Sequence, residues 1–221
     1  MGSYLNPGNF SFRGSLRSKI YVDKSELIAK TNEALCTEQR YICVSRPRRF
    51  GKSMAANMLA AYYDRSENIE ELFRNLAISK DSSYKENLNQ YDVIKINMQE
   101  FLSMSGTMEE MLEMLKKYLV LDFEETYPQV RFRDEKNLIQ VMKDVFSYTR
   151  CPFVILIDEW DCLFREYKQD REAQKKYLDF LRAWLKDKDY VALAYMTGIL
   201  PIKKYGSHSA LNMFTEYSMT D

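Results

Sequence analysis

A strand–loop–helix stretch that contains Gly51-Lys52-Ser53 constrains the fold of this chain more than any other part of the sequence. An apolar run at 41–44 precedes the loop, and a helix-forming run at 54–60 follows it. Because the first amides of a helix have no acceptor within the helix, and the helix dipole makes that end partly positive, a polyphosphate can bind there. Gly51 would let the backbone approach it, Lys52 would reach the β- and γ-phosphates, and Ser53 would bind Mg²⁺.

The loop departs from the usual phosphate-binding pattern at one position. In the pattern Gly-x4-Gly-Lys-Ser, the first glycine falls on Arg46. The loop therefore lacks the positive-φ freedom of a glycine at that point, and Pro47 fixes φ at the next residue. Two interpretations stay open from this motif alone. The stretch is either a phosphate-binding loop that begins differently or an ordinary helix start, since Gly-Lys-Ser is common by chance.

Strands alternate with helices along the rest of the chain. Three further runs are rich in apolar and β-branched residues, as strands are: 91–97, 153–157 and 191–196. Four other stretches carry apolar residues at helical spacing: 27–35, 107–119, 138–146 and 177–185. This alternation predicts an α/β fold with a parallel, doubly wound sheet. A chain of 221 residues is long enough to bury the core of one such domain.

An acidic pair, Asp158-Glu159, directly follows the strand predicted at 153–157. In a parallel sheet the carboxyl ends of the strands lie along one edge, from which the loop with Gly-Lys-Ser would also emerge. Asp158 would assist Mg²⁺ and Glu159 would polarise the attacking water, although a carboxylate pair can also merely end a strand. Thr197, after the next strand, would contact the γ-phosphate or the water, unless it belongs to an ordinary turn. Together the two motifs predict a nucleoside triphosphate site.

The composition excludes several other classes of function. Lys plus Arg and Asp plus Glu both number 32, so the chain as a whole is no electrostatic binder of nucleic acid. The densest basic cluster is Arg46, Arg48, Arg49 and Lys52, which a triphosphate explains as well as DNA does. The cysteines and the single histidine lack the spacing of zinc ligands. With no signal peptide and no run near the ~20 apolar residues of a membrane span, we expect a cytoplasmic protein without a membrane partner.

Four motifs together identify a resemblance to a known family: Tyr-Val-Asp-Lys-Ser at 21–25, Arg-Pro-Arg-Arg-Phe-Gly-Lys-Ser at 46–53, Ile-Asp-Glu-Trp-Asp at 157–161 and Thr-Gly-Ile at 197–199. With these motifs the chain resembles the AAA-ATPase-like proteins of bacteria from about residue 4 to residue 205. Members of that family carry Arg-Pro-Arg-Arg-Phe in place of the first loop glycine, so the resemblance accounts for Arg46. The motif at 21–25 would pack near the base of the nucleotide, although a capped helix start at Asp23 or Ser25 fits equally well.

The resemblance implies a P-loop NTPase fold, that is, a three-layer α/β/α sandwich with a mainly parallel, AAA-like sheet. The domain would span 21–221 after an irregular, turn-rich lead-in at 1–20. ATP and Mg²⁺ are the implied cofactors, with Glu159, Lys52 and Thr197 in catalysis and Ser53 and Asp158 at the metal. The implied nucleotide-binding residues are Arg46, Pro47, Arg48, Arg49, Phe50, Gly51, Lys52, Ser53 and Met54.

The same resemblance bears on partners. Members commonly carry a C-terminal nuclease-like domain of the PD-(D/E)XK type, which is not visible in this sequence. The sequence also shows no evident fifth strand after 191–196, so we expect the front part of a longer protein with an effector domain. Nucleic acid would then bind only through that further domain. Arg48 or Arg49 would reach the phosphates of a neighbouring subunit if the protein forms a homo-oligomer.

Three functions stay open from the sequence. The first is an ATPase in which Glu159 activates water, and the second is a nucleotide-gated switch with little hydrolysis. The third is a nucleic-acid-binding module built on the basic cluster at 46–52, against which the zero net charge and Asp158-Glu159 argue. The acidic pair on the central strand also favours an ATPase over a small-molecule kinase.

Overall fold

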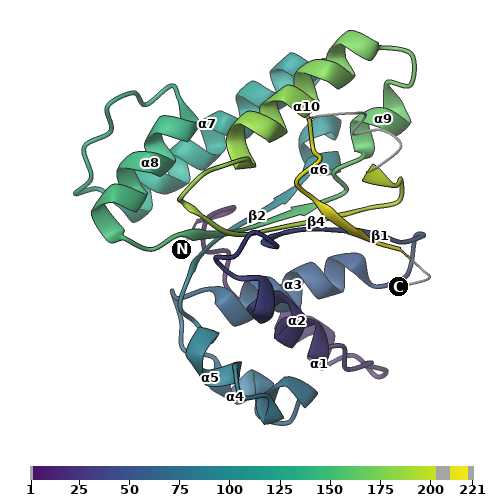
Figure 1. The fold of residues 1–221 in the computed structure, drawn as a ribbon, viewed down its shortest axis with the longest axis vertical. Helices are drawn as coiled ribbons and strands as arrows, with labels where there is room; N and C mark the ends of the chain where they lie inside the picture. The colour runs from purple at the N-terminus through teal and green to yellow at the C-terminus, as the bar shows by residue number, and fades with distance from the viewer. Residues whose placement is uncertain (1, 203–209, 219–221) are drawn as a thin grey trace.

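A five-stranded parallel sheet lies at the centre of the computed structural model, which describes residues 2–202 and 210–218. The strand order is β2-β3-β4-β1-β5. The strands are β1 (Tyr41–Ser45), β2 (Asp92–Asn97), β3 (Phe153–Asp158), β4 (Val191–Gly198) and β5 (Thr215–Tyr217). Figure 1 shows the sheet between two helical layers. The predicted fold class, a three-layer α/β/α sandwich with a parallel sheet, is confirmed.

Each face of the sheet is covered by helices that are contiguous in the sequence (Figure 1). The first layer contains α1 (Phe10–Leu16), α2 (Glu26–Ala34), α3 (Lys52–Tyr63), α4 (Glu70–Phe73), the 3-10 turn η1 (Ala77–Lys80) and α5 (Tyr84–Asn87). The second contains α6 (Met98–Ser103), α7 (Met108–Thr126), α8 (Leu138–Thr149), α9 (Cys162–Glu166) and α10 (Arg171–Leu185). The predicted longer helices are all present. The short α4, α5, α6 and α9 span too few turns for a periodic pattern to reveal them.

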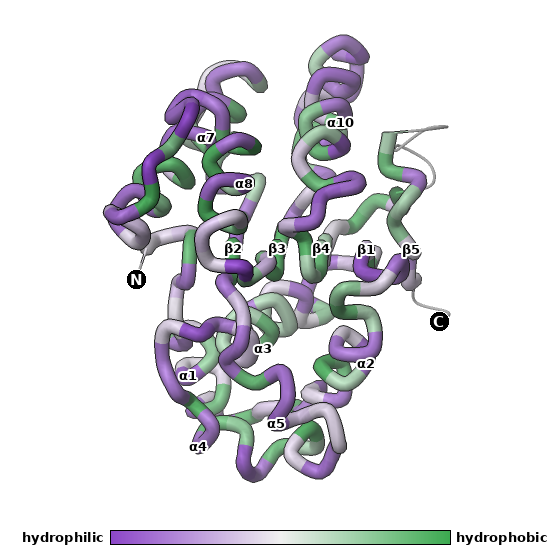
Figure 2. The backbone as a smooth tube through the Cα atoms, turned by 60° about the vertical axis from the view of Figure 1, so that its left-hand side comes forward, coloured by the Kyte–Doolittle hydropathy of each residue, from purple (hydrophilic) through white to green (hydrophobic). Residues whose placement is uncertain are grey.

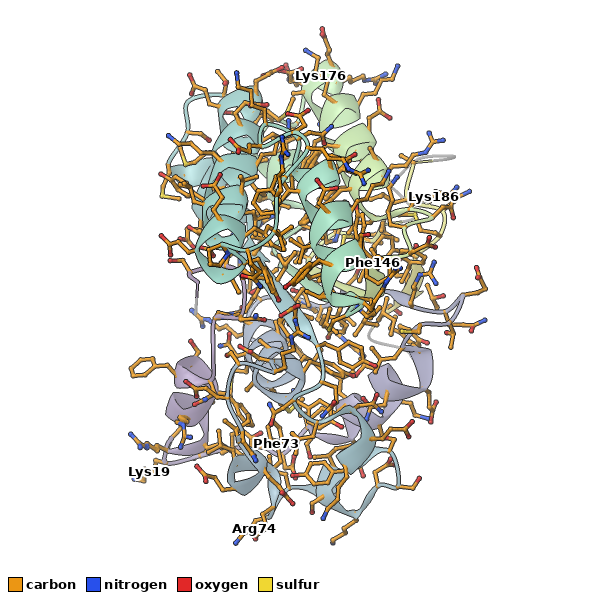
Figure 3. All side chains as sticks on the ribbon, turned by 90° about the vertical axis from the view of Figure 1, so that its left-hand side faces the viewer. Lys19, Phe73, Arg74, Phe146, Lys176 and Lys186 are labelled. Atoms are coloured by element: carbon orange, nitrogen blue, oxygen red, sulfur yellow. The ribbon has the colours of Figure 1, made fainter. Side chains whose placement is uncertain are left out.

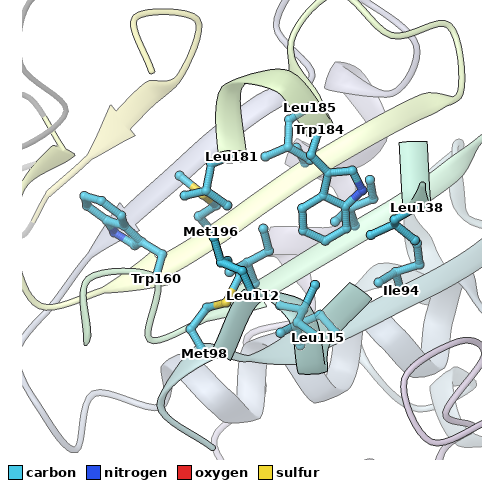
Figure 4. Close-up of a cluster of buried hydrophobic side chains, with 14 of the residues drawn as sticks. Ile94, Met98, Leu112, Leu115, Leu138, Trp160, Leu181, Trp184, Leu185 and Met196 are labelled. Carbon is cyan, nitrogen blue, oxygen red and sulfur yellow. The ribbon is translucent and has the colours of Figure 1, made fainter. Parts of the chain in front are cut away.

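Two hydrophobic cores, one on each face, hold the layers together. Every residue of β3 and β4 is buried, which explains their uninterrupted apolar runs. In Figure 4, Leu181 and Trp184 of α10 lie over Ile94 and Met196 of the sheet. Burial of each such side chain stabilises the fold by about 1.5–3 kcal/mol. Figure 2 shows the hydrophobic residues concentrated where the helices meet the strands, and Figure 3 shows charged side chains such as Lys176 extending outward.

The structure corrects two expectations from the sequence. A fifth strand does follow β4, because β5 pairs in parallel with β1, with Ile42 opposite Thr215 and Val44 opposite Tyr217. Its three residues, Thr-Glu-Tyr, form no apolar run, so the sequence pattern gives no signal for it. The lead-in is also not irregular throughout. It contains the helix α1, whose Phe12 stacks on Phe73 with ring centroids 5.0 Å apart.

The topology brings three chain segments to one edge of the sheet. β4 lies between β1 and β3, and all three strands run in the same direction. Ser45, the last residue of β1, lies opposite Gly198 at the end of β4. Asp158, the last residue of β3, lies opposite Asn97 at the end of β2. The loop after β1 and the acidic pair after β3 therefore flank the end of β4, as the sequence predicts.

Candidate functional site

The loop between β1 and α3 reverses direction through two left-handed residues. Gly51 caps the start of α3 with φ of 78°, and Arg49 has φ of 70°. Only glycine adopts such angles without cost, so Gly51 matches its position. The Lys52 side chain folds back into the loop, where its Nζ donates to the carbonyls of Arg46 and Pro47, both at 3.0 Å. The loop thus surrounds a buried ammonium group at the N-terminus of a helix.

The position that lacks a glycine needs none in this loop. Arg46 is not among the residues with positive φ, and its amide donates to the carbonyl of Gly198 at 3.0 Å. The first loop residue therefore continues the β1–β4 ladder instead of turning. The left-handed turns fall later, on residues 49 and 51. The remaining loop residues predicted to bind nucleotide are exposed to solvent: Pro47, Arg48, Phe50, Ser53 and Met54.

Asp158 joins three of the predicted site residues. The Ser53 hydroxyl donates to Asp158 Oδ2 at 2.5 Å, and the Thr197 hydroxyl donates to Oδ1. The amide of Glu159 also donates to Oδ1, at 3.0 Å. Asp158 is almost fully buried, and these three hydrogen bonds compensate its carboxylate for the loss of water. A buried charge without such partners would be strongly unfavourable. The ends of β3 and β4 and the first turn of α3 thus converge on one side chain.

The carboxylate of Glu159 lies elsewhere. Glu159 has a left-handed backbone, with φ of 54°, and its side chain forms an ion pair with Arg165 of α9. Arg165 also donates to Oε1 of Gln99, on α6, at 3.3 Å. The structure therefore brings Ser53, Asp158 and Thr197 together, but it pairs Glu159 with Arg165 of α9. The sequence reasoning did not find Arg165, because only its spacing of four residues from Asp161 hinted at a contact.

Asp161 fastens the acidic turn to the end of β4. Its fully buried Oδ2 accepts from the amides of Ile199, at 3.0 Å, and Leu200, at 2.8 Å. The amide of Trp160 donates to the carbonyl of Thr197 at 3.1 Å. Gly198 must be a glycine here, because a Cβ atom would lie 2.6 Å from Nε1 of Trp160. These contacts fix Thr197 beside Asp158.

A cavity of about 700 Å³ lies beside the loop, between α2 and the sheet. Leu27 of α2, Ile42 of β1 and Ala55 of α3 contribute apolar walls, and Tyr217 of β5 closes one side. Lys24 also lines it and donates to the carbonyl of Phe50 at 3.2 Å. Ser25 is the N-cap of α2. The motif at 21–25 thus ends at the start of a helix, although the Ser25 side chain forms no cap hydrogen bond there, and its packing near a nucleotide base stays a prediction.

A second lysine approaches Asp158 from β2. Burial lowers the pKa of Lys95, and the negative charges of Asp158 and Glu100 oppose that decrease.

The thiol of Cys162, in α9, is unsuited to act as a nucleophile. Burial raises the pKa of the Cys162 thiol to about 12, so it stays protonated at neutral pH.

The oxygen atoms at this site are suitable ligands for a hard cation that also binds water and phosphate. Among the described residues, no group of three or more His, Cys, Asp and Glu side chains could hold a metal by itself. Ser53 Oγ and Asp158 Oδ2, however, are two potential metal-binding oxygens that lie 2.5 Å apart beside the loop. Mg²⁺ is bound in proteins by such sparse oxygen sets, together with water and substrate phosphates. The residues present therefore fit Mg²⁺ as a partner of a bound nucleotide.

Comparison with known proteins gives one family. No curated protein matches the chain. The family model described as "Predicted AAA-ATPase" matches residues 12–207, which include the loop, the acidic pair and the end of β4. In the described part of the chain no helix is long and apolar enough to cross a membrane. Because the family model matches most of its length, the chain belongs to the AAA-ATPase-like family, and this membership implies nucleotide binding.

Proposed function

We propose that the protein is an ATPase that binds ATP with Mg²⁺ at the loop after β1 and hydrolyses it. One observation carries the proposal. Ser53 and Thr197, from α3 and β4, both donate to the buried Asp158 on β3, next to Lys52 at the helix N-terminus. Four residues that the motifs single out for the nucleotide site thus come from three segments, α3, β3 and β4, and meet at one edge of the sheet.

The phosphates would bind at the N-terminus of α3. The amides of its first turn supply donors, and Lys52 would exchange its two carbonyl partners for the β- and γ-phosphates. The exposed Arg48 and Arg49 would add positive charge, either here or at a neighbouring subunit. When bound, Mg²⁺ supplies positive charge at the phosphate oxygens. Ser53 would bind it directly and Asp158 through water.

The base and ribose would occupy the cavity between α2 and the sheet. Its volume of about 700 Å³ falls within the range of small-molecule sites, roughly 300–1,000 Å³. The cavity meets the loop at Gly51 and Lys52, so one molecule could contact both regions. Leu27 and Ile42 offer apolar surface to a planar base.

Hydrolysis would use the two strand ends beside the phosphates. Glu159 would accept a proton from the attacking water, and Thr197 would contact the γ-phosphate. Asp158 would hold both Ser53 and Thr197 in place. The runner-up function, a nucleotide-gated switch with little hydrolysis, is favoured by a specific observation. In this structure the Glu159 carboxylate pairs with Arg165 instead of facing Ser53.

Calorimetric titration with ATP and Mg²⁺ tests the site. We expect micromolar binding by the wild type and a loss of about 100-fold or more in Lys52→Ala, because a charged hydrogen-bond donor to the phosphates disappears. Lys176→Ala is the matched control, because that lysine is exposed on α10 and pairs with Glu109 and Glu172. Absence of binding by the wild type would contradict the proposal. A turnover assay then separates the ATPase from the switch.

The proposal also covers a further effector domain and the oligomeric state of the protein. The domain at 21–221 would act with an effector domain, and a homo-oligomer would form if Arg48 or Arg49 serves a neighbouring site. Light scattering with and without ATP tests the second point. A monomeric mass in both conditions would show that Arg48 and Arg49 do not act at the site of a neighbouring subunit.

A further inference from the structure

Two side chains that flank Lys24 attach its backbone to η1. Oδ2 of Asp23 accepts from the amide of Ala77 at 2.8 Å, and Oγ of Ser25 accepts from the amide of Ile78 at 3.0 Å. Asp23 also accepts, through Oδ1, from the amide of Ser25 at 2.8 Å. Ser25 is fully buried. Because both neighbours bind the same element, the residue between them has a defined position.

The ammonium group of Lys24 reaches the loop after β1. Its Nζ donates to the carbonyl of Phe50 at 3.2 Å and lies 3.5 Å from the position that a Cβ atom would take on Gly51. The residue is exposed, and in the described part of the chain it forms no ion pair with a carboxylate. An ammonium has three N–H donors, and the carbonyl of Phe50 uses one of them. Lys24 therefore has donors left for a ligand beside Gly51.

The charges that line the cavity between α2 and the sheet favour an anionic ligand. Among the described residues of this lining, the cationic side chains are Lys24, Lys30, Arg46 and Lys52, and the anionic one is Glu33. Lys30 pairs with Glu33 at 3.4 Å. Lys24 and Lys52 instead donate to carbonyls of the loop, so positive charge without a carboxylate partner gathers where the cavity meets the loop. A ligand that extends from the cavity to the loop gains from negative charge at that point.

We propose that Lys24 is a second phosphate-binding lysine, which contacts the α-phosphate of the nucleotide while Lys52 reaches the β- and γ-phosphates. Lys24 lines the cavity proposed for the base and ribose, and its Nζ lies beside Gly51 of the loop proposed for the phosphates. The phosphate nearest the ribose must pass between these two regions. Lys24 would exchange the carbonyl of Phe50 for a phosphate oxygen, since a hydrogen bond between two charged groups is the stronger one. The inference rests on the proposed function and specifies a further residue of its site.

Lys24→Gln tests the inference by calorimetric titration with ATP and with ADP, each with Mg²⁺. The amide can still donate to the carbonyl of Phe50, but the positive charge is lost. We expect the Kd of both nucleotides to rise by about tenfold, because both carry an α-phosphate and lose the same charged hydrogen bond. Lys24→Arg retains the charge and should restore most of the affinity.

A matched control and a stability measurement separate phosphate binding from a structural role. Lys80→Gln is the control, because Lys80 is also exposed and ends η1, to which the neighbours of Lys24 are attached, but it does not line the cavity. Its Kd values should stay within about twofold of the wild type. The urea midpoint of Lys24→Gln without nucleotide should equal that of the wild type. A lysine that only holds the loop predicts a lower midpoint instead.

Amine acetylation followed by mass spectrometry tests the same contact without a substitution. We expect ADP with Mg²⁺ to slow the modification of Lys24, because a bound phosphate would cover its Nζ. Adenosine at the same concentration should not slow it, since adenosine has no phosphate. Lys80 reports any general change and should react equally in all samples. Equal protection of Lys24 by adenosine and ADP would overturn the assignment to a phosphate.

The outcomes distinguish this inference from the proposed function. If the wild type binds ATP and Lys52→Ala does not, but Lys24→Gln binds like the wild type, the inference fails and the proposed nucleotide site stands. A loss of affinity for ATP without a loss for ADP would place Lys24 at the γ-phosphate and overturn its assignment to the α-phosphate. If the wild type binds neither nucleotide, the proposed function fails and the inference fails with it.

Discussion

The loop after β1 and the turn after β3 meet at the same edge of the sheet, but they are held in opposite ways. The loop residues from Pro47 to Phe50 are exposed, and the side chain of Lys52 makes its contacts within the loop itself. The turn at 158–161 is largely buried and is tied to β4 by backbone and side-chain hydrogen bonds. This difference suggests a division of roles. Under the proposed function, the exposed loop would adapt to phosphates, whereas the buried turn would hold groups whose positions are set in advance.

Removal of the proposed base should produce the largest effect and would show that the turn serves chemistry. We expect Glu159→Gln to lower kcat by about 10²–10⁴-fold, the usual contribution of a general base, with the affinity for ATP retained. Steady-state turnover and calorimetry on the same samples check this. An unchanged kcat would assign the protein to the nucleotide-gated switch instead.

A methyl group added at Gly198 should break the attachment of the turn to β4. Because its Cβ would lie 2.6 Å from Trp160 Nε1, we expect Gly198→Ala to lower the free energy of unfolding by about 1–3 kcal/mol. Gly14→Ala is the matched control, since a Cβ there meets nothing within 4 Å and the residue lies in α1. Its stability should rise by about 0.5–1 kcal/mol. Urea unfolding would show the two values, and equal values would contradict a tightly packed turn.

The same change in the loop should affect binding more than stability. A Cβ at Gly51 has space, with the nearest atom, Lys24 Nζ, at 3.5 Å, but φ is 78°. We therefore expect Gly51→Ala to cost about 1 kcal/mol of stability through backbone strain. ATP affinity should fall further, because the methyl group would face the phosphates. A variant that loses stability as much as Gly198→Ala would erase the contrast between loop and turn.

The smallest expected effect concerns Lys95, beside the turn. Its pKa is lower in the folded protein than the ordinary 10.5, so just below that pH the unfolded chain binds more protons than the folded chain. The contribution of this lysine to stability therefore rises with pH as the pH approaches 10.5. Lys95→Met should remove that increase. Urea midpoints of both proteins at pH 8 and pH 10 measure it, and parallel changes would contradict the assignment.

The sequence predicts the parts of this molecule that repeat a local pattern. The apolar run at 153–157 predicts β3, and the Gly-Lys-Ser motif predicts the start of α3, because both depend on neighbours in the chain. Local patterns do not predict β5 or the contacts of Arg165. β5 exists through its pairing with β1, and the contact of Arg165 with Gln99 joins residues 66 positions apart. The site roles of Glu159, Lys52 and the loop residues remain predictions until they are measured.

The short strand β5 has a consequence for how this protein could diversify. Its Tyr217 lines the cavity beside the loop, whereas the side chains that meet at Asp158 come from α3, β3 and β4. Substitutions of Tyr217 would reshape the wall of the cavity without replacing Lys52, Ser53 or Asp158. Under the proposed function, ligand preference could therefore vary through an edge strand while the chemistry varies through the central strands.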